Sequence, residues 1–88
     1  MNEVDCVLRL VRHEAGEAIE VHGPDYSSAH EAFAVLLEEV EEFKEQVWLK
    51  RAHRSKRKMV NELVQVAAVS VKYAAQLQRE MGPEKEVM

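Results

Sequence analysis

Residues 63–77, which read LVQVAAVSVKYAAQL, restrict the fold of this chain more than any other segment. Eleven of these fifteen residues are apolar, and at helical spacing they surround the helix instead of forming a stripe. A helix that is apolar on all sides has to be covered on all sides. Two other helices of an 88-residue chain do not cover it easily, so we expect a second copy to complete the packing, most simply across a two-fold axis. The alternative is the alanine-rich central helix of a monomeric three-helix bundle.

The remainder of the chain also favours helices. Both prolines follow a glycine, at residues 23–24 and 82–83, and leave long segments without such breaks. Apolar residues recur at helical spacing over residues 3–22, and the capping box of Ser28 and Glu31 predicts a second amphipathic helix from about residue 28 to 49. We therefore predict one all-α domain, residues 1–88, with three main helices per chain that complete a helical bundle by homo-oligomerisation. Residues 82–88 are expected to form a frayed tail.

Charge is segregated along the sequence. The net charge is −4, yet residues 50–58, KRAHRSKRK, hold six of the twelve Lys and Arg and no acidic residue. The single cysteine excludes a disulfide within the chain, and no run of about 18 uncharged apolar residues is present to span a membrane. The N-terminus, MNEVDCVLRL, has acids where a signal peptide has positive charge. These features predict a cytoplasmic protein that does not associate with membranes.

A dense group of glutamates lies in the second predicted helix, in LLEEVEEFKE at residues 36–45. Like charges at this spacing repel, so an isolated helix gains no stability from them. Glu39 and Glu42 share one flank of the helix, where their carboxylates can converge on a hard divalent cation such as Mg²⁺. Glu62 and Gln65 repeat the same spacing at the head of the third helix, where polar residues are otherwise scarce. The alternative is an acidic helix face that solvent and salt screen.

These two short motifs resemble the signature of a known family. Residues 38–42, EEVEE, a 19-residue interval and residues 62–65, ELVQ, are similar to the EExxE…ExxD pattern of the MazG-like all-α nucleoside triphosphate pyrophosphohydrolases. That superfamily includes the dimeric dUTPases and phosphoribosyl-ATP pyrophosphatase, and the resemblance covers about residues 27–78. Its members are dimers or dimers of dimers that bind Mg²⁺ and cleave nucleoside triphosphates to monophosphate and pyrophosphate. The resemblance thus implies a Mg²⁺-dependent nucleotide pyrophosphohydrolase, with a role such as nucleotide house-cleaning.

The resemblance also implies roles for single residues. Glu39, Glu42 and Glu62 correspond to ligands of Mg²⁺, for which Mn²⁺ can substitute, and Glu38 to a residue that holds a second ion or orients the attacking water. The family has aspartate where this chain has Gln65, whose amide oxygen can ligate a cation but adds no charge. Either the enzyme works with a weaker or single metal, or the chain keeps the fold as a catalytically silent helical oligomer that acts as a binding or structural module.

The basic run lies between the two half-motifs, which would let one or two of its residues reach a β- or γ-phosphate. The candidates are Lys50, Arg51, Arg54, Lys56, Arg57 and Lys58. The alternatives are a solvated cationic loop and a nucleic-acid contact. The second is disfavoured by the negative net charge, by the acidic helices on either side and by the lack of an aromatic residue in the run.

Two single residues carry further expectations. Trp48 ends the apolar stripe of the second helix, which favours a place in the core over stacking on a base. Lys72 interrupts the apolar third helix, where a buried charge is costly. We therefore expect Lys72 to reach a carboxylate of another copy or to extend its ammonium group to solvent.

Overall fold

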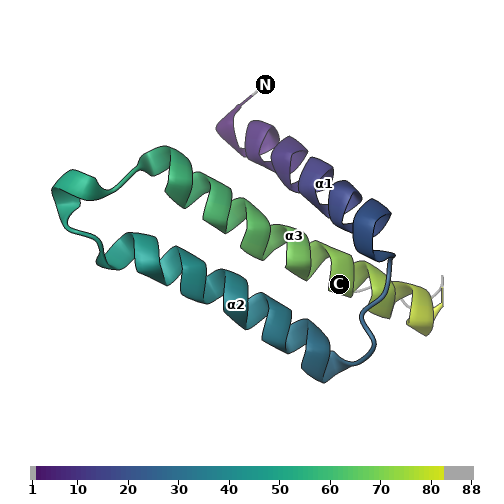
Figure 1. The fold of residues 1–88 in the computed structure, drawn as a ribbon. Helices are drawn as coiled ribbons and strands as arrows, with labels where there is room; N and C mark the ends of the chain where they lie inside the picture. Colours follow the sequence, from purple (N-terminus) through teal and green to yellow (C-terminus); the bar gives the residue numbers. More distant parts are fainter. Residues whose placement is uncertain (1, 83–88) are drawn as a thin grey trace.

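The computed structural model describes residues 2–82, and these form three α-helices and one turn of 3₁₀ helix. Helix α1 spans Glu3–His22, α2 spans Ala29–Trp48, the turn η1 spans Arg51–His53 and α3 spans Lys56–Met81 (Figure 1). The all-α prediction is confirmed, and the predicted bounds of α1 and α2 agree with the structure to within one residue. Of the expected frayed tail, residues 83–88 lie outside the described residues.

Local side-chain bonds fix where the helices begin. The Oδ1 of Asn2 accepts a hydrogen bond from the backbone N–H of Asp5 at 2.9 Å, at the start of α1. Ser28 Oγ accepts from the N–H of Glu31 at 3.0 Å, and Glu31 Oε1 accepts in turn from the N–H of Ser27 at 2.8 Å. The predicted cap of α2 is therefore confirmed, with the return bond displaced by one residue from the usual capping box.

Helix α1 ends at Gly23, whose φ of 83° lies in the left-handed region. The N–H of Gly23 donates to the carbonyl of Ile19 at 2.8 Å, so the glycine closes the last turn in a conformation that other residues adopt only under strain. The chain then crosses to α2 through residues 24–28. Gln76 of α3 anchors this loop at both backbone groups of Tyr26, accepting from its N–H at 2.8 Å and donating to its carbonyl at 3.1 Å.

Helix α3 is the centre of the fold. It packs against α1 and against α2, whereas α1 and α2 do not pack on each other within residues 2–82 (Figure 1). The buried apolar residues are small or medium in size and lie along these two seams: Val11, Ala15, Ala32, Val64 and Ala68. The core of the single chain is therefore thin. Within the described residues, none of the helices is both long and apolar enough to cross a membrane.

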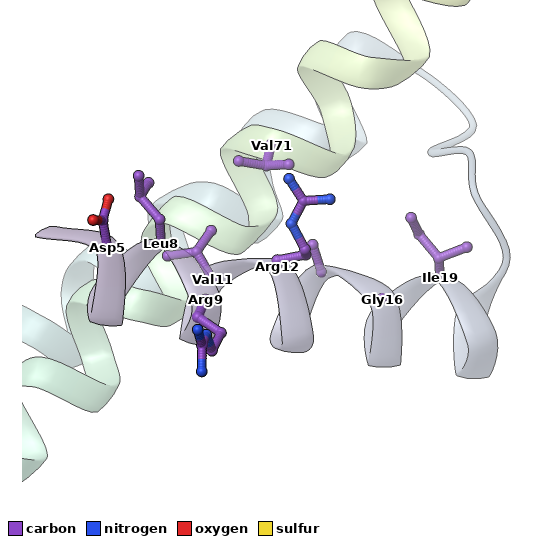
Figure 2. Close-up of a pocket in the computed structure, with 9 residues that line it drawn as sticks. Asp5, Leu8, Arg9, Val11, Arg12, Gly16, Ile19 and Val71 are labelled. Atoms are coloured by element: carbon purple, nitrogen blue, oxygen red, sulfur yellow. The ribbon is translucent and has the colours of Figure 1, made fainter. Parts of the chain in front are cut away.

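Much of the apolar surface stays uncovered. The exposed large apolar residues of α3 lie on one side of the helix, which we call the α3 outer face: Val60, Leu63, Val71, Leu77 and Met81. Phe33 of α2 is 62% exposed. An open groove of about 680 Å³ runs along α1, where Leu8, Val11 and Ile19 face Val71 of α3 (Figure 2). The two flanking helices thus leave α3 partly bare, as the composition of residues 63–77 predicts.

The structure contradicts the expectation for Trp48 and one of the two alternatives for Lys72. Trp48 is 74% exposed, because it is the last residue of α2, where the chain turns away toward η1 (Figure 1). Lys72 does not extend to solvent but is 4% exposed, with its Nζ 4.3 Å from the centroid of the Tyr26 ring. The loop that Gln76 anchors carries Tyr26 over α3 and covers the lysine there.

Candidate metal centre

Three of the four predicted metal ligands converge between α2 and α3. Glu39 and Glu42 lie on successive turns of α2, and Glu62 lies in the second turn of α3. Each offers a carboxylate oxygen, and the three oxygens lie within 4.8 Å of one another. We call these residues the acidic cluster. The antiparallel hairpin of α2 and α3 brings the two half-motifs of the sequence to the same level (Figure 1).

The acidic cluster contains polar atoms without partners. One carboxylate oxygen of Glu39 and one of Glu62, the Oε2 in each case, are buried and accept no hydrogen bond within residues 2–82. Buried acceptors of this kind are rare in folded proteins, since each loses its hydration without compensation. Two unsatisfied oxygens on adjacent helices are therefore a candidate pair of ligands for a cation or its bound water.

Gln46 lies one helical turn beyond Glu42 on α2, and the sequence analysis did not predict it as a site residue. Its Oε1 is the third buried oxygen without a partner among the described residues. The signal was present in the spacing, because residues 39, 42 and 46 recur at helical intervals and share one face of α2. The EExxE pattern covers only residues 38–42, so it did not indicate Gln46. A neutral amide oxygen can supplement carboxylates around a hard cation, as proposed for Gln65.

Proton affinities in the acidic cluster are raised. Burial is the main reason that the pKa of Glu39 reaches about 7, and a hydrogen bond with Glu42 and the charges of Glu42, Glu62 and Glu38 add to it. Burial also raises the pKa of Glu62, followed by its hydrogen bond with Glu42 and the charges of Glu42 and Glu45. Near neutral pH the cluster consequently holds a proton that a divalent cation would displace.

A cavity of about 480 Å³ adjoins the acidic cluster. It is lined by residues from all three helices and from the loop before α2: Ala18, His22, Asp25, Tyr26, Glu31, Val35, Glu39, Gln65, Val69 and Lys72. Gln65, the fourth predicted ligand, thus shares this cavity with Glu39. Burial raises the pKa of Tyr26, and the charges of Glu31 and Glu39 add to the effect, which places both carboxylates near its ring.

The remaining predicted site residues do not belong to the acidic cluster. Glu38 is exposed on α2, close enough to Glu39 for its charge to act on that carboxyl. The six basic residues 50, 51, 54 and 56–58 are all exposed, at the end of the molecule where α2 connects to α3 (Figure 1). None of the six forms an ion pair within 4.0 Å in the described part of the chain, and Arg54 Nε donates to the carbonyl of Leu49 at 3.1 Å.

Three of these six residues lie in a helix and not in a loop. Lys56, Arg57 and Lys58 form the first turn of α3, capped by Ser55, whose Oγ accepts from the N–H of Lys58 at 3.2 Å. Positive charge at a helix N-terminus opposes the helix dipole, so these residues do not favour the helix that they begin. Their side chains are free to interact with an anion beside the acidic cluster.

No family model, curated protein or solved structure matches this chain. The likeness of its glutamate motifs to the MazG-like signature therefore stays a prediction, and the proposal below rests on the residues of the site.

Proposed function

We propose that this chain is a Mg²⁺-dependent nucleoside triphosphate pyrophosphohydrolase, which releases a nucleoside monophosphate and pyrophosphate. The observation that carries the proposal is the acidic cluster, in which two helices bring three carboxylates together and leave buried oxygens of Glu39 and Glu62 without partners. Carboxylates that repel one another and keep buried oxygens without partners are better suited to a cation than to stability. The resemblance of both half-motifs to the MazG-like pattern supports the same reading.

The donor set fits a hard cation. Glu39, Glu42 and Glu62 supply carboxylate oxygens, Gln65 and Gln46 supply neutral ones, and no sulfur or imidazole ligand belongs to the cluster. Such oxygen sets suit Mg²⁺ and Mn²⁺. When bound, the cation would neutralise phosphate charge and lower the pKa of a water.

Two sets of side chains near the ion would then act on the substrate. Glu38, exposed beside Glu39, would accept a hydrogen bond from the attacking water and orient it toward the α-phosphorus. Lys56, Arg57 and Lys58, which have no ion pairs among the described residues, would bind the departing pyrophosphate.

We further propose that the working form is a homo-oligomer, a dimer or a dimer of dimers. Each of the three helices leaves large apolar side chains uncovered, and Leu8, Phe33 and Val71 are between 47% and 62% exposed. Chains of this size bury only about 60 to 65% of their unfolded surface, and a second copy would add the missing burial. Exposed apolar surface of this extent is typical of an interaction site.

One observation favours a second candidate, a silent helical oligomer that keeps the fold without catalysis. Gln65 replaces the aspartate of the family pattern and removes one negative charge beside the cluster. The two candidates differ in their response to metal. Only the hydrolase predicts that Mg²⁺ raises the melting temperature and supports turnover.

Pyrophosphate release from a panel of nucleoside triphosphates, with Mg²⁺ or with EDTA, tests the proposal. We expect Mg²⁺-dependent release that Glu39→Gln and Glu62→Gln abolish. Glu41→Gln is the matched control, because Glu41 lies on the same helix but outside the cluster, in an exposed ion pair with Lys44 at 3.8 Å. A folded wild-type protein without Mg²⁺-dependent release, and without a change in melting temperature on adding Mg²⁺, would refute the hydrolase.

A further inference from the structure

Lys72 is a buried cation without an anionic partner. Its side chain is 4% exposed, and within residues 2–82 it forms neither an ion pair nor a hydrogen bond. Its one described polar contact is with the ring of Tyr26, at 4.3 Å from Nζ to the centroid. A cation–π contact compensates only part of the hydration that a buried ammonium group loses. The ammonium group can donate three hydrogen bonds, and a ligand with hydrogen-bond acceptors could accept them.

The cavity beside the acidic cluster is where such an acceptor can enter. Lys72 and Tyr26 line it together with Glu39 and Gln65, and its volume of about 480 Å³ falls in the usual range for small-molecule sites. Glu39 on its wall belongs to the acidic cluster, and two other acidic residues there already have partners. Asp25 pairs with Arg79 at 2.5 Å, and Glu31 accepts from the N–H of Ser27. Lys72 is the cation that remains available to a ligand in the cavity.

Glu62 of the acidic cluster and Lys72 of the cavity lie at two separate positions along α3. Glu62, Gln65 and Lys72 lie on one face of the helix, since they are three and seven residues apart. At about 1.5 Å per residue, Lys72 lies about 15 Å from Glu62 along the axis. A ligand that contacts both has to be extended, with a part that suits a metal at one end and hydrogen-bond acceptors at the other.

We propose that the cavity binds the base of the nucleotide and that Lys72 donates a hydrogen bond to a carbonyl oxygen of that base. The inference rests on the proposed function, which places the phosphates at the acidic cluster, and it adds the class of substrate. Nucleotides with an oxo group at this edge, such as uracil, are preferred over those with an amino group, such as cytosine. An amino group presents donors to a lysine that can only donate.

Uridine and cytidine triphosphates test this preference, because their bases differ at position 4 in carrying an oxo or an amino group. We expect wild-type kcat/KM to favour UTP by roughly tenfold or more, the usual effect of a hydrogen bond to a charged group. Lys72→Met keeps an unbranched chain beneath Tyr26 without the donor, and should bring the UTP to CTP ratio close to one. Lys72→Arg keeps the charge and should retain part of the preference. Equal wild-type values, or an equal loss for both nucleotides in Lys72→Met, would overturn the inference.

Binding of the monophosphates separates this inference from the proposed hydrolase. Titration calorimetry with UMP and CMP in the presence of Mg²⁺ needs no turnover. If no triphosphate is hydrolysed, the hydrolase fails, while tighter binding of UMP than of CMP, lost in Lys72→Met, still supports the base site. Equal affinities or no binding of either monophosphate refute it. Should Lys72→Met fail to fold, the wild-type comparison and Lys72→Arg decide.

Discussion

Replacing Glu39 by glutamine removes the group whose ionisation opposes folding most clearly. The pKa of Glu39 is about 7 in the folded protein against an ordinary 4.5, chiefly because of burial. At about 1.4 kcal/mol per pKa unit, the difference corresponds to a gross penalty of about 3.5 kcal/mol once the carboxyl is ionised. Glu39 is only half-buried, so solvent screening reduces the expected net penalty to about 1 to 2 kcal/mol.

The sign of the pH dependence follows from the raised pKa. Below pH 4.5 the carboxyl is protonated in both states and contributes no penalty. Between pH 4.5 and about 7 the unfolded chain releases the proton while the folded protein keeps it, so the free energy of unfolding falls as pH rises. Above pH 7 the full penalty applies. Glu39→Gln should remove this contribution to the fall in the free energy of unfolding between pH 4.5 and about 7.

Urea unfolding in EDTA at pH 4 and pH 8 measures the effect. At pH 8 we expect Glu39→Gln to be more stable than wild type by about 1 to 2 kcal/mol, or roughly 4 to 8 °C in melting temperature for each kcal/mol. At pH 4 the difference in the free energy of unfolding between the two proteins should be smaller. Glu41→Gln is again the control and should change little at either pH, because its ion pair with Lys44 is more than half exposed.

Metal should reverse the order of stability of wild type and Glu39→Gln. Excess Mg²⁺ should raise the melting temperature of wild type by mass action and that of Glu39→Gln by less, since one ligand has lost its charge. If Glu39→Gln is less stable than wild type at pH 8 in EDTA, the carboxylate is structural. The reasoning from repulsion and burial would then be refuted.

Three other predictions test different parts of the molecule. Gln65→Asp adds a carboxylate to the cavity beside Glu39, and should bind Mn²⁺ more tightly in titration calorimetry; equal affinities would mean that residue 65 does not reach the ion. Phe33→Glu, at a side chain that is 62% exposed in the single chain, should leave a monomer folded but dissociate an oligomer, so light scattering of wild type and variant tests the assembly. Gln76→Leu leaves both backbone groups of Tyr26 without partners and should lower the free energy of unfolding by about 1 to 3 kcal/mol in urea titrations.

Much of the secondary structure was predictable because its signals are local. The glycine after His22 and the hydroxyl of Ser28 act within one helical turn, and they set the bounds of α1 and α2. The start of α3 was obscured by residues 56–58, since three consecutive basic residues resemble a solvated loop. The cap from Ser55 decides in favour of the helix.

The candidate site was predictable in part. The spacing of Glu39 and Glu42 follows from one helix, whereas their proximity to Glu62 depends on how α2 packs on α3. The burial of Lys72 depends on Tyr26 from a distant loop, and the orphaned oxygen of Gln46 depends on what surrounds α2. The periodicity of a single segment does not contain these tertiary contacts. The sequence therefore did not predict that the loop would cover Lys72, and it did not indicate Gln46.

Helix α3 links the site and the proposed assembly, because it buries two polar residues beside its apolar core residues and exposes apolar residues on its other side. In an ordinary surface helix the polar residues face solvent and the apolar ones face the core. Here Lys72 and Gln76 are 4% and 7% exposed, while Leu63 and Val71 on the α3 outer face are 48% and 47% exposed. A single chain gains little from exposing apolar residues while burying a charge, so each face favours something that the isolated chain lacks. The inner face favours a polar ligand between the helices, and the outer face favours a second copy of the chain.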